Sequence, residues 1–336
     1  MLQAIPCPLC HNDRSFLPVE VTDRDDHIRD YGALYAGKTL SEWKICGECG
    51  FVHQNPRPTI ESLNRFYQAG NYHPPVERDF AALMAWAPDY YREEVSWAIR
   101  TSGLQRGSVF DIGCGYGVAL HLFEELGWSC FGVEPDPGQY QFARTKLGLT
   151  QIKLGILDAN FTLGEKVDLV FTHHAFEHFA DLTSVMSGIK KILKPGGYVF
   201  TAVPTYYENR SSMSKQWMNS AHYSLFTHGS LNQLMARHGF EEVRHRYDHS
   251  GRKPDQFCHL AKYVGGEQNP RPFYEHAAHV DRYLRVTNPL RSLACYPLYG
   301  ALPQRAFDAA RYLGGSASLL VSSPREFYRR VKLRLS

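Results

Sequence analysis

A single run constrains the fold of this 336-residue chain more than any other, the stretch Val109-Phe-Asp-Ile-Gly-Cys-Gly-Tyr-Gly117. It places glycine at positions 113, 115 and 117, after a short β-type segment and before an apolar helical pattern. Glycine accepts the backbone angles of a tight turn between a strand and a helix. The run therefore predicts a strand, a glycine turn and a helix, which together begin a parallel α/β sheet.

The residues after this turn alternate between short apolar runs and longer helical patterns, as βαβ units do. We expect strands near residues 108–112, 130–134, 152–156, 168–173 and 197–203, and helices near 117–127, 137–147, 181–193 and 230–238. The segment Lys194-Pro-Gly-Gly197 is expected to be a turn into the last of these strands. The predicted fold class is α/β, a doubly wound, Rossmann-like, mostly parallel sheet.

Four of the eight cysteines form two Cys-x-x-Cys pairs near the N-terminus. This spacing lets two short turns aim four thiolates at one tetrahedral Zn²⁺, which predicts a closed, structural zinc ribbon with the ligands Cys7, Cys10, Cys46 and Cys49. The alternatives are two pairs of reduced thiols or one redox pair. The other cysteines, at 114, 130, 258 and 295, are expected to be small buried hydrophobic residues.

These features divide the chain into four parts. We expect a small zinc ribbon at 1–56, a helical linker or cap at 57–107, a cofactor-binding domain at 108–266 and a basic, mainly helical extension at 267–336. In the linker, Leu63, Phe66 and Tyr67 fall at helical spacing, as the core-facing side of an amphipathic helix would.

Acidic residues stand at the ends of the first three predicted strands of the central domain. Asp111 lies two residues before the first glycine of the turn, where its charge opposes a phosphate and favours a cationic ligand. Glu134 ends the second strand and can accept hydrogen bonds from both hydroxyls of a ribose. Asp158 follows the third strand, within reach of an exocyclic adenine amine. The pattern predicts a nucleoside with a positive charge as the ligand.

The segments DIGCGYG, GVEPD, LDAN, DLVFTHHAFEHF and LKPGGYVF resemble the successive motifs of class I S-adenosylmethionine-dependent methyltransferases. The resemblance covers about residues 108 to 264. It implies that Asp111, Gly113, Gly115 and Gly117 form the cofactor loop, that Glu134 binds the ribose and that Asp158 binds the adenine. We also expect His173 and Tyr67 in the cofactor pocket. A different nucleotide-binding fold or an inactive scaffold is the alternative.

The order of Cys-x-x-Cys, CxxCGF, NPRP and FYQAGNY before this domain is similar to that in bacterial zinc-ribbon methyltransferases of sugar and surface-glycan biosynthesis. This second resemblance implies a small-molecule acceptor, a sugar or glycan precursor. Methyltransferases of nucleic-acid amines carry an Asn/Asp-Pro-Pro-aromatic turn after the fourth strand, whereas this chain has Thr-His-His-Ala. An oxygen or carbon acceptor is therefore expected rather than nitrogen.

The run from Thr172 to His178 follows the fourth strand, at the sheet edge where doubly wound folds bind ligands. His174, Glu177 and His178 are candidates for a general base or for substrate hydrogen bonds, with positioning of the next helix as the alternative. His222 is a further catalytic candidate, with Tyr223 beside it, because the family closes this segment over the substrate. Loop packing is the alternative for both. The match of 174–178 to the HxxEH zinc-protease motif is rejected, because its setting is a strand end and not a helix.

The net charge of +3, from 37 Lys and Arg against 34 Asp and Glu, is too balanced for a general nucleic-acid binder. Methylation of RNA, with the ribbon binding the RNA phosphates, is therefore only an alternative to a sugar or glycan acceptor. A non-catalytic scaffold is a second alternative. The N-terminus has no secretory signal pattern, so a cytoplasmic protein is expected. Phe327, Val331 and Leu335 line a basic terminal helix, which either rests on the anionic inner face of a membrane or packs on protein.

Overall fold

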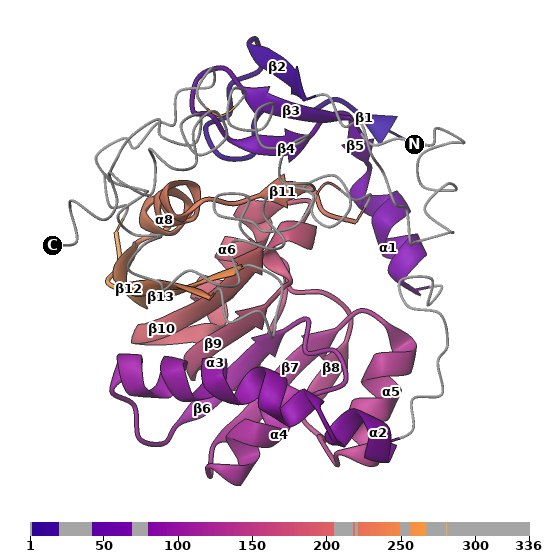
Figure 1. Ribbon diagram of the computed structural model, residues 1–336, viewed down its shortest axis with the longest axis vertical. Helices are drawn as coiled ribbons and strands as arrows, with labels where there is room; N and C mark the ends of the chain where they lie inside the picture. Colours follow the sequence, from indigo (N-terminus) through magenta and orange to yellow (C-terminus); the bar gives the residue numbers. More distant parts are fainter. Residues whose placement is uncertain are drawn as a thin grey trace, which may run out of the picture. The chain divides into compact units, whose positions relative to one another are not determined.

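The computed structural model describes residues 2–19, 42–68, 80–204, 218, 221–248, 256–266 and 280 (Figure 1). All of them belong to the first of two units of the chain, Met1–Val286. The expectations for the terminal helix at 323–336 and for Cys295 lie outside the described residues. Among the helices that the structure describes, none has the length and apolar character to cross a membrane.

The centre of the fold is a seven-stranded sheet with the order β12-β13-β10-β9-β6-β7-β8. Five neighbouring strands are parallel, β6 (Ser108–Ile112), β7 (Ser129–Glu134), β8 (Ile152–Leu154), β9 (Val167–His173) and β10 (Leu193–Pro204). The predicted doubly wound, mostly parallel sheet is thereby confirmed. Two antiparallel strands, β12 (Phe240–Asp248) and β13 (Gln256–Tyr263), extend it beyond β10.

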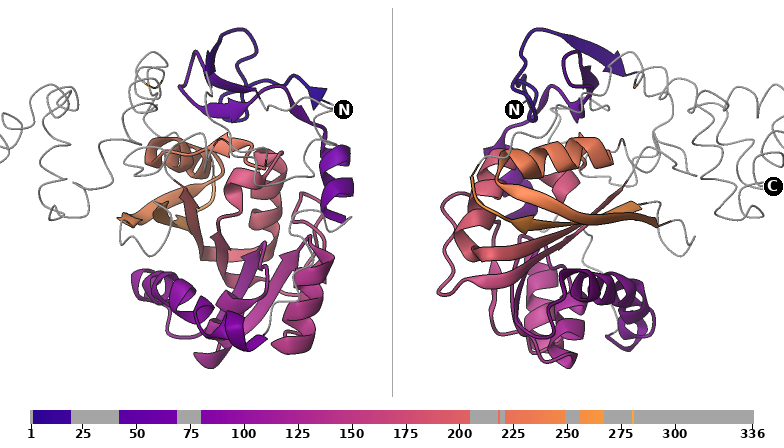
Figure 2. Two further views of the ribbon diagram at one scale, coloured as in Figure 1. Left: turned by 45° about the vertical axis from the view of Figure 1, so that its right-hand side comes forward. Right: turned by 90° about the vertical axis from the view of Figure 1, so that its left-hand side faces the viewer.

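Helices cover both faces of this sheet (Figure 1). On one face, Val95, Trp97 and Ala98 of α3 (Ala87–Ser102) share an apolar cluster with strand residues and with the helices α4 (Val118–Glu125) and α5 (Pro137–Lys146). On the other face, a second cluster joins the strands to the helices α6 (Leu182–Ile192) and α8 (His228–Arg237). In Figure 2 the orange helix α8 lies beside the hairpin of β12 and β13. Burial on two faces leaves the strand ends as the place for a site.

Residues 87–102 belong to the expected helical linker or cap at 57–107, and they form α3 (Ala87–Ser102), whose Trp97 ring packs on Phe200 of β10 at a centroid distance of 5.8 Å. This helix therefore packs directly on the central sheet. The expected turn at 194–197 lies within β10, where the register shifts between Leu193 and Tyr198. Gly196, at φ 76°, supplies the irregular backbone there.

The N-terminal segment forms a small antiparallel sheet of β2 (Phe16–Val19), β3 (Trp43–Cys46) and β4 (Val52–Gln54). Its fourth strand is β11 (Ser224–Leu225), which comes from the central domain and pairs with β4. A second short pair joins β1 (Leu2–Gln3) to β5 (Arg57–Pro58), two residues beyond the expected end of the ribbon. The ribbon sheet is thus completed by a strand about 170 residues away in sequence.

Two helices connect this sheet to the central domain, α1 (Ile60–Gln68) and α2 (Phe80–Met84). In α1, Leu63 and Phe66 are buried and pack against Ala221 and Tyr223. This agrees with the expected amphipathic helix. The side chain of Tyr67, placed in the cofactor pocket from the sequence, lies outside the description.

Candidate functional site

A cavity of about 450 Å³ opens at the carboxyl ends of β6, β7 and β9. The glycine turn, the strand ends and part of α1 contribute to its lining. Seven of the residues predicted from the sequence line it, namely Gly113, Gly115, Glu134, Asp158, His173, His174 and His178. A volume of this size suits a small-molecule ligand, since such pockets hold about 300–1,000 Å³.

The charges along this cavity are acidic. Glu134, Asp158 and Asp181 contribute carboxyl groups, and neither Lys nor Arg occurs among the described lining residues. Glu134 accepts hydrogen bonds from the backbone N–H groups of Gly115 at 2.7 Å and Asp136 at 2.8 Å. Burial raises the pKa of Glu134 to about 7. The cavity therefore favours a neutral or cationic ligand over a phosphorylated one.

Asp111 and Gly117 are not among the residues that line the cavity, so their assignment to the cofactor loop stays a prediction. Asp111 is only 3% exposed, and burial, together with the nearby Glu134, raises its pKa well above the ordinary value. Gly117, at φ 82°, begins α4. A Cβ there would stand 2.4 Å from Cδ1 of Leu149, so this glycine is needed for close packing.

His174 has an unusual backbone and a defined hydrogen-bond partner. Its φ angle is 52°, in the left-handed region that residues other than glycine seldom adopt. Its Nε2 lies 2.5 Å from Oε1 of Gln256, whose Nε2 donates to Oε1 of the buried Glu94 at 3.0 Å. A carboxylate only accepts, so the amide nitrogen faces Glu94 and the amide oxygen faces the imidazole. His174 therefore donates from Nε2, and in the neutral ring its Nδ1 carries the lone pair.

His178 is oriented by the backbone. Its Nδ1 donates to the carbonyl oxygen of Ala221 at 2.9 Å, so in the neutral ring Nε2 carries the lone pair. The ring of His222 lies at 4.7 Å from the ring of His178, centroid to centroid. His222 is buried and does not line the cavity, and Tyr223 is completely buried, so neither reaches the described cavity surface.

Glu177 lies next to His174 and His178, two of the three histidines that line the cavity. It is 1% exposed, it does not line the cavity, and neither carboxyl oxygen has a hydrogen-bond partner among the described residues. Its Oε1 stands 3.8 Å from Nδ1 of His174 and 4.0 Å from Nε2 of His178. Burial raises the pKa of Glu177 to about 8. The three side chains can therefore hold a proton near neutral pH.

Several residues that shape the site were not singled out from the sequence. Gln256 and Glu94 orient His174, and Tyr90 and Tyr91 of α3 contact the ring of His173 at centroid distances of 5.6 and 5.1 Å. Only the pairing of β13 with β10 brings Gln256 to the site. No local motif marks these positions.

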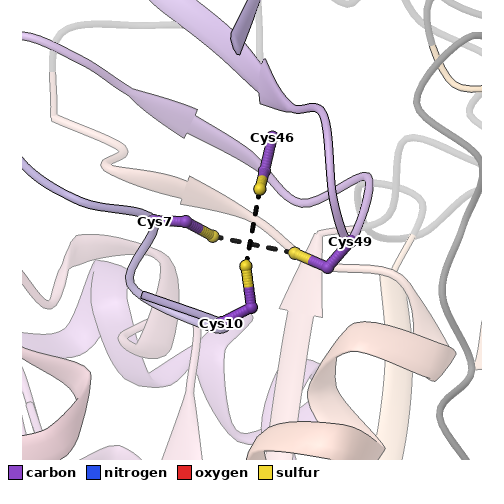
Figure 3. Close-up of side chains that lie close together, drawn as sticks. All are labelled: Cys7, Cys10, Cys46 and Cys49. Atoms are coloured by element: carbon purple, nitrogen blue, oxygen red, sulfur yellow. Dashed lines mark hydrogen bonds between the residues drawn. The ribbon is translucent and has the colours of Figure 1, made fainter. Parts of the chain in front are cut away.

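The four cysteines of the N-terminal segment converge (Figure 3). Their sulfur atoms all lie within 4.8 Å of one another, with 3.7 Å between Cys7 and Cys49 and 3.5 Å between Cys10 and Cys46. A tetrahedron with Zn–S bonds of about 2.3 Å places its sulfurs about 3.8 Å apart. The donor set and its spacing therefore fit a closed zinc site.

Residues 85–245 match a protein family described as a methyltransferase domain. C-methyltransferase NovU of Streptomyces niveus is 28% identical over 165 residues, which are 46% of this chain and 38% of that protein. A ubiquinone biosynthesis O-methyltransferase of Hydrogenovibrio crunogenus is 26% identical over 153 residues, 44% of this chain and 61% of that protein. The chain thus covers less than two thirds of either relative.

Among solved structures, the fold is similar to that of 1,6-didemethyltoxoflavin-N1-methyltransferase of Burkholderia thailandensis. The two chains are 14% identical, with a TM-score of 0.47, and the match covers 64% of this chain and 96% of the other.

Replacing Glu177 by Gln should change how stability depends on pH. The folded-state pKa is raised from 4.5 to about 8, so the folded protein keeps a proton that the unfolded chain releases. This contribution is complete below pH 4.5 and is lost as the pH rises through 8. Relative to Glu177→Gln, the parent should lose about 1.4 kcal/mol of unfolding free energy per pH unit across this window.

Urea unfolding at a series of pH values measures this difference. Glu165→Gln, at an exposed position, should leave the pH dependence of the parent unchanged. Parallel curves for the parent and Glu177→Gln would show that Glu177 is ionised in the folded protein.

Proposed function

We propose that residues 85–245, a class I methyltransferase domain, transfer a methyl group from S-adenosylmethionine to an oxygen or carbon of a neutral small molecule, a sugar or glycan precursor. One observation carries the proposal. The cavity brings three carboxyl groups and no described Lys or Arg together with two histidines of defined orientation.

The residues around the glycine turn fit the cofactor. Gly113 and Gly115 let a ligand approach the backbone, and the carboxyl of Glu134 keeps lone pairs for ribose hydroxyls beyond its two bonds to N–H groups. Asp158, which also lines the cavity, binds the adenine amine in this proposal. When bound, S-adenosylmethionine supplies a methyl group on a positively charged sulfur, which the acidic lining favours.

His174 and His178, which both line the cavity, can serve as the base that takes a proton from the acceptor. Methyl transfer needs the acceptor aligned in a dry pocket, and a hydroxyl or carbon acid must also lose a proton. Nδ1 of His174 and Nε2 of His178 can take that proton, with Glu177 next to them as a further proton site. His222 supports the ring of His178 from behind and has no direct role in this scheme.

The charge of the described cavity lining also indicates the class of acceptor. The same cavity has no described cation for a phosphate, which argues against RNA and in favour of a hydroxylated neutral compound. The two relatives named above are a C-methyltransferase and an O-methyltransferase, in line with a carbon or oxygen acceptor.

The ribbon holds zinc in this proposal as a structural element. Four sulfur ligands fill a tetrahedral site and leave no open position for chemistry. The ribbon contacts the segment 221–225 through Gln54. The backbone N–H of Gln54 donates to the carbonyl of Tyr223 at 3.0 Å, and the side chain of Gln54 donates to the carbonyl of His222 at 2.5 Å. Loss of zinc is therefore expected to disturb the 221–225 segment.

Glu134→Gln should weaken the binding of S-adenosylmethionine by roughly 10- to 100-fold, because hydrogen bonds to a charged group contribute about 1.5–3 kcal/mol. Glutamine has a similar volume and keeps one acceptor oxygen. Isothermal titration calorimetry measures the affinity, with Glu165→Gln as the control that should bind as the parent does.

Equal affinity in the parent and Glu134→Gln would contradict the assignment of Glu134. If the zinc-loaded parent binds no S-adenosylmethionine at all, the domain is a scaffold and the proposed activity is wrong.

His174→Ala should lower kcat by roughly 10²- to 10⁴-fold, the usual contribution of a general base, with little change in cofactor affinity. Gln256→Leu should lower kcat less and should change the pH–rate profile, because it removes the acceptor that fixes the His174 tautomer. Labelled S-adenosylmethionine with a panel of sugar derivatives provides the assay.

His121→Ala, at a half-exposed position on α4 away from the cavity, is the matched control and should keep full activity. Full activity in His174→Ala together with a large loss in His178→Ala would transfer the role of base to His178.

A further inference from the structure

A second group of metal-binding side chains lies outside the cavity and outside the cysteine cluster. It consists of His228 at the start of α8, Glu242 and His245 on β12, and His259 on β13, and we name it the imidazole cluster. We propose that the imidazole cluster binds a divalent first-row transition metal ion, with zinc as the natural choice. This proposal does not depend on the methyltransferase activity.

The ligand atoms are already gathered around one carboxylate. Nε2 of His228 lies 2.5 Å from Oε2 of Glu242, and Nδ1 of His245 lies 2.7 Å from Oε1. The potential ligand atoms of these three residues lie within 4.8 Å of one another. The rings of His228 and His245 are stacked at a centroid distance of 3.8 Å.

His259 provides the independent observation. Its side chain has no exposed surface, and its Nε2 points to the same carboxylate, 3.3 Å from Oε2 of Glu242. Neither ring nitrogen of His259 makes a hydrogen bond of acceptable geometry to a described residue. A buried imidazole without a hydrogen bond is costly, and a metal ion at the carboxylate would satisfy it.

The donor set indicates the class of ion. Three imidazole nitrogens and one carboxylate oxygen suit zinc, nickel, cobalt or copper, whereas calcium and magnesium take oxygen ligands. Around zinc, ligands at about 2.0–2.2 Å stand about 3.4 Å apart, so the two hydrogen-bonded pairs of His228 and His245 with Glu242 must separate by less than about 1 Å. His259 is not in the group whose ligand atoms lie within 4.8 Å of one another, so its ring must also move towards the two other imidazoles to become the fourth ligand. Because four protein ligands complete a tetrahedron, the site would be structural.

An ion can reach this position from solvent. The side chains of His228 and His245 are 30% and 34% exposed, and that of Glu242 is 22% exposed. The cluster therefore has one closed side, formed by His259, and one open side.

The location gives the ion a structural role near the cavity. It would join α8 to both strands of the β12–β13 hairpin. His259 lies three residues after Gln256, which orients His174, and His228 lies six residues after His222. A metal bound there would stabilise the part of the sheet that carries Gln256.

Zinc titration of the untagged full-length protein tests the proposal. The protein is first loaded with zinc and treated with a weak chelator, which leaves the ion held by the four cysteines. Calorimetry should then detect one further zinc ion per chain. His245→Ala and Glu242→Gln should each weaken its binding by at least about 100-fold, more than the loss of an outer hydrogen-bond partner causes.

His121→Ala is the control for a half-exposed histidine that faces a glutamate, and it should bind the further ion as the parent does. Cobalt distinguishes the sites spectroscopically, since thiolate ligands give charge-transfer bands and the imidazole cluster should add only weak ligand-field bands. Circular dichroism verifies that both cluster variants are folded.

Two results would overturn the proposal. The first is a parent protein that binds no ion beyond the one at the cysteines. The second is a further ion that persists in His245→Ala and disappears in His178→Ala, which would place it among Glu177, His178 and His222.

Discussion

The two hydrogen bonds of Glu134 are the interaction on which the cavity depends. Parallel strands end at one edge, so the turns after β6 and β7 meet there. The Glu134 carboxyl, at the end of β7, accepts the N–H of Gly115 from the first turn and the N–H of Asp136 from the second. One buried side chain thereby holds both turns at the cavity lining. Glycine at position 115, at φ 56°, allows the turn to approach so closely.

The N-terminal sheet and the segment 221–225 are joined by strand pairing and by hydrogen bonds. Strand β11 completes the ribbon sheet. The residues just before β11 contact the segment at the cavity: the N–H of Tyr223 donates to the carbonyl of Glu177, and the carbonyl of Ala221 accepts from Nδ1 of His178. The orientation of His178 therefore depends on a segment held by Gln54 of β4. The small sheet that carries the four cysteines is thus connected by hydrogen bonds to a histidine that lines the cavity.

Patterns within short stretches of the sequence were enough to predict the elements that such stretches determine. The glycine turn, the five parallel strands and the convergence of four cysteines follow from spacing and periodicity. The pairing of strands that are far apart in the sequence could not be predicted from such patterns. Ser224 joins His53 across the ribbon, and Gln256 reaches His174 only because β13 pairs with β10. The burial of Asp111 likewise depends on the strands that flank β6, which its place in the motif does not show.

A crystal structure of the protein with S-adenosylhomocysteine tests the central claim most directly. The account predicts the ligand in the cavity at the ends of β6, β7 and β9, with its ribose hydroxyls within hydrogen-bond distance of the Glu134 carboxylate. Its adenine amine should lie beside Asp158. A fully occupied ligand bound elsewhere, with Glu134 in contact only with Gly115 and Asp136, would contradict it.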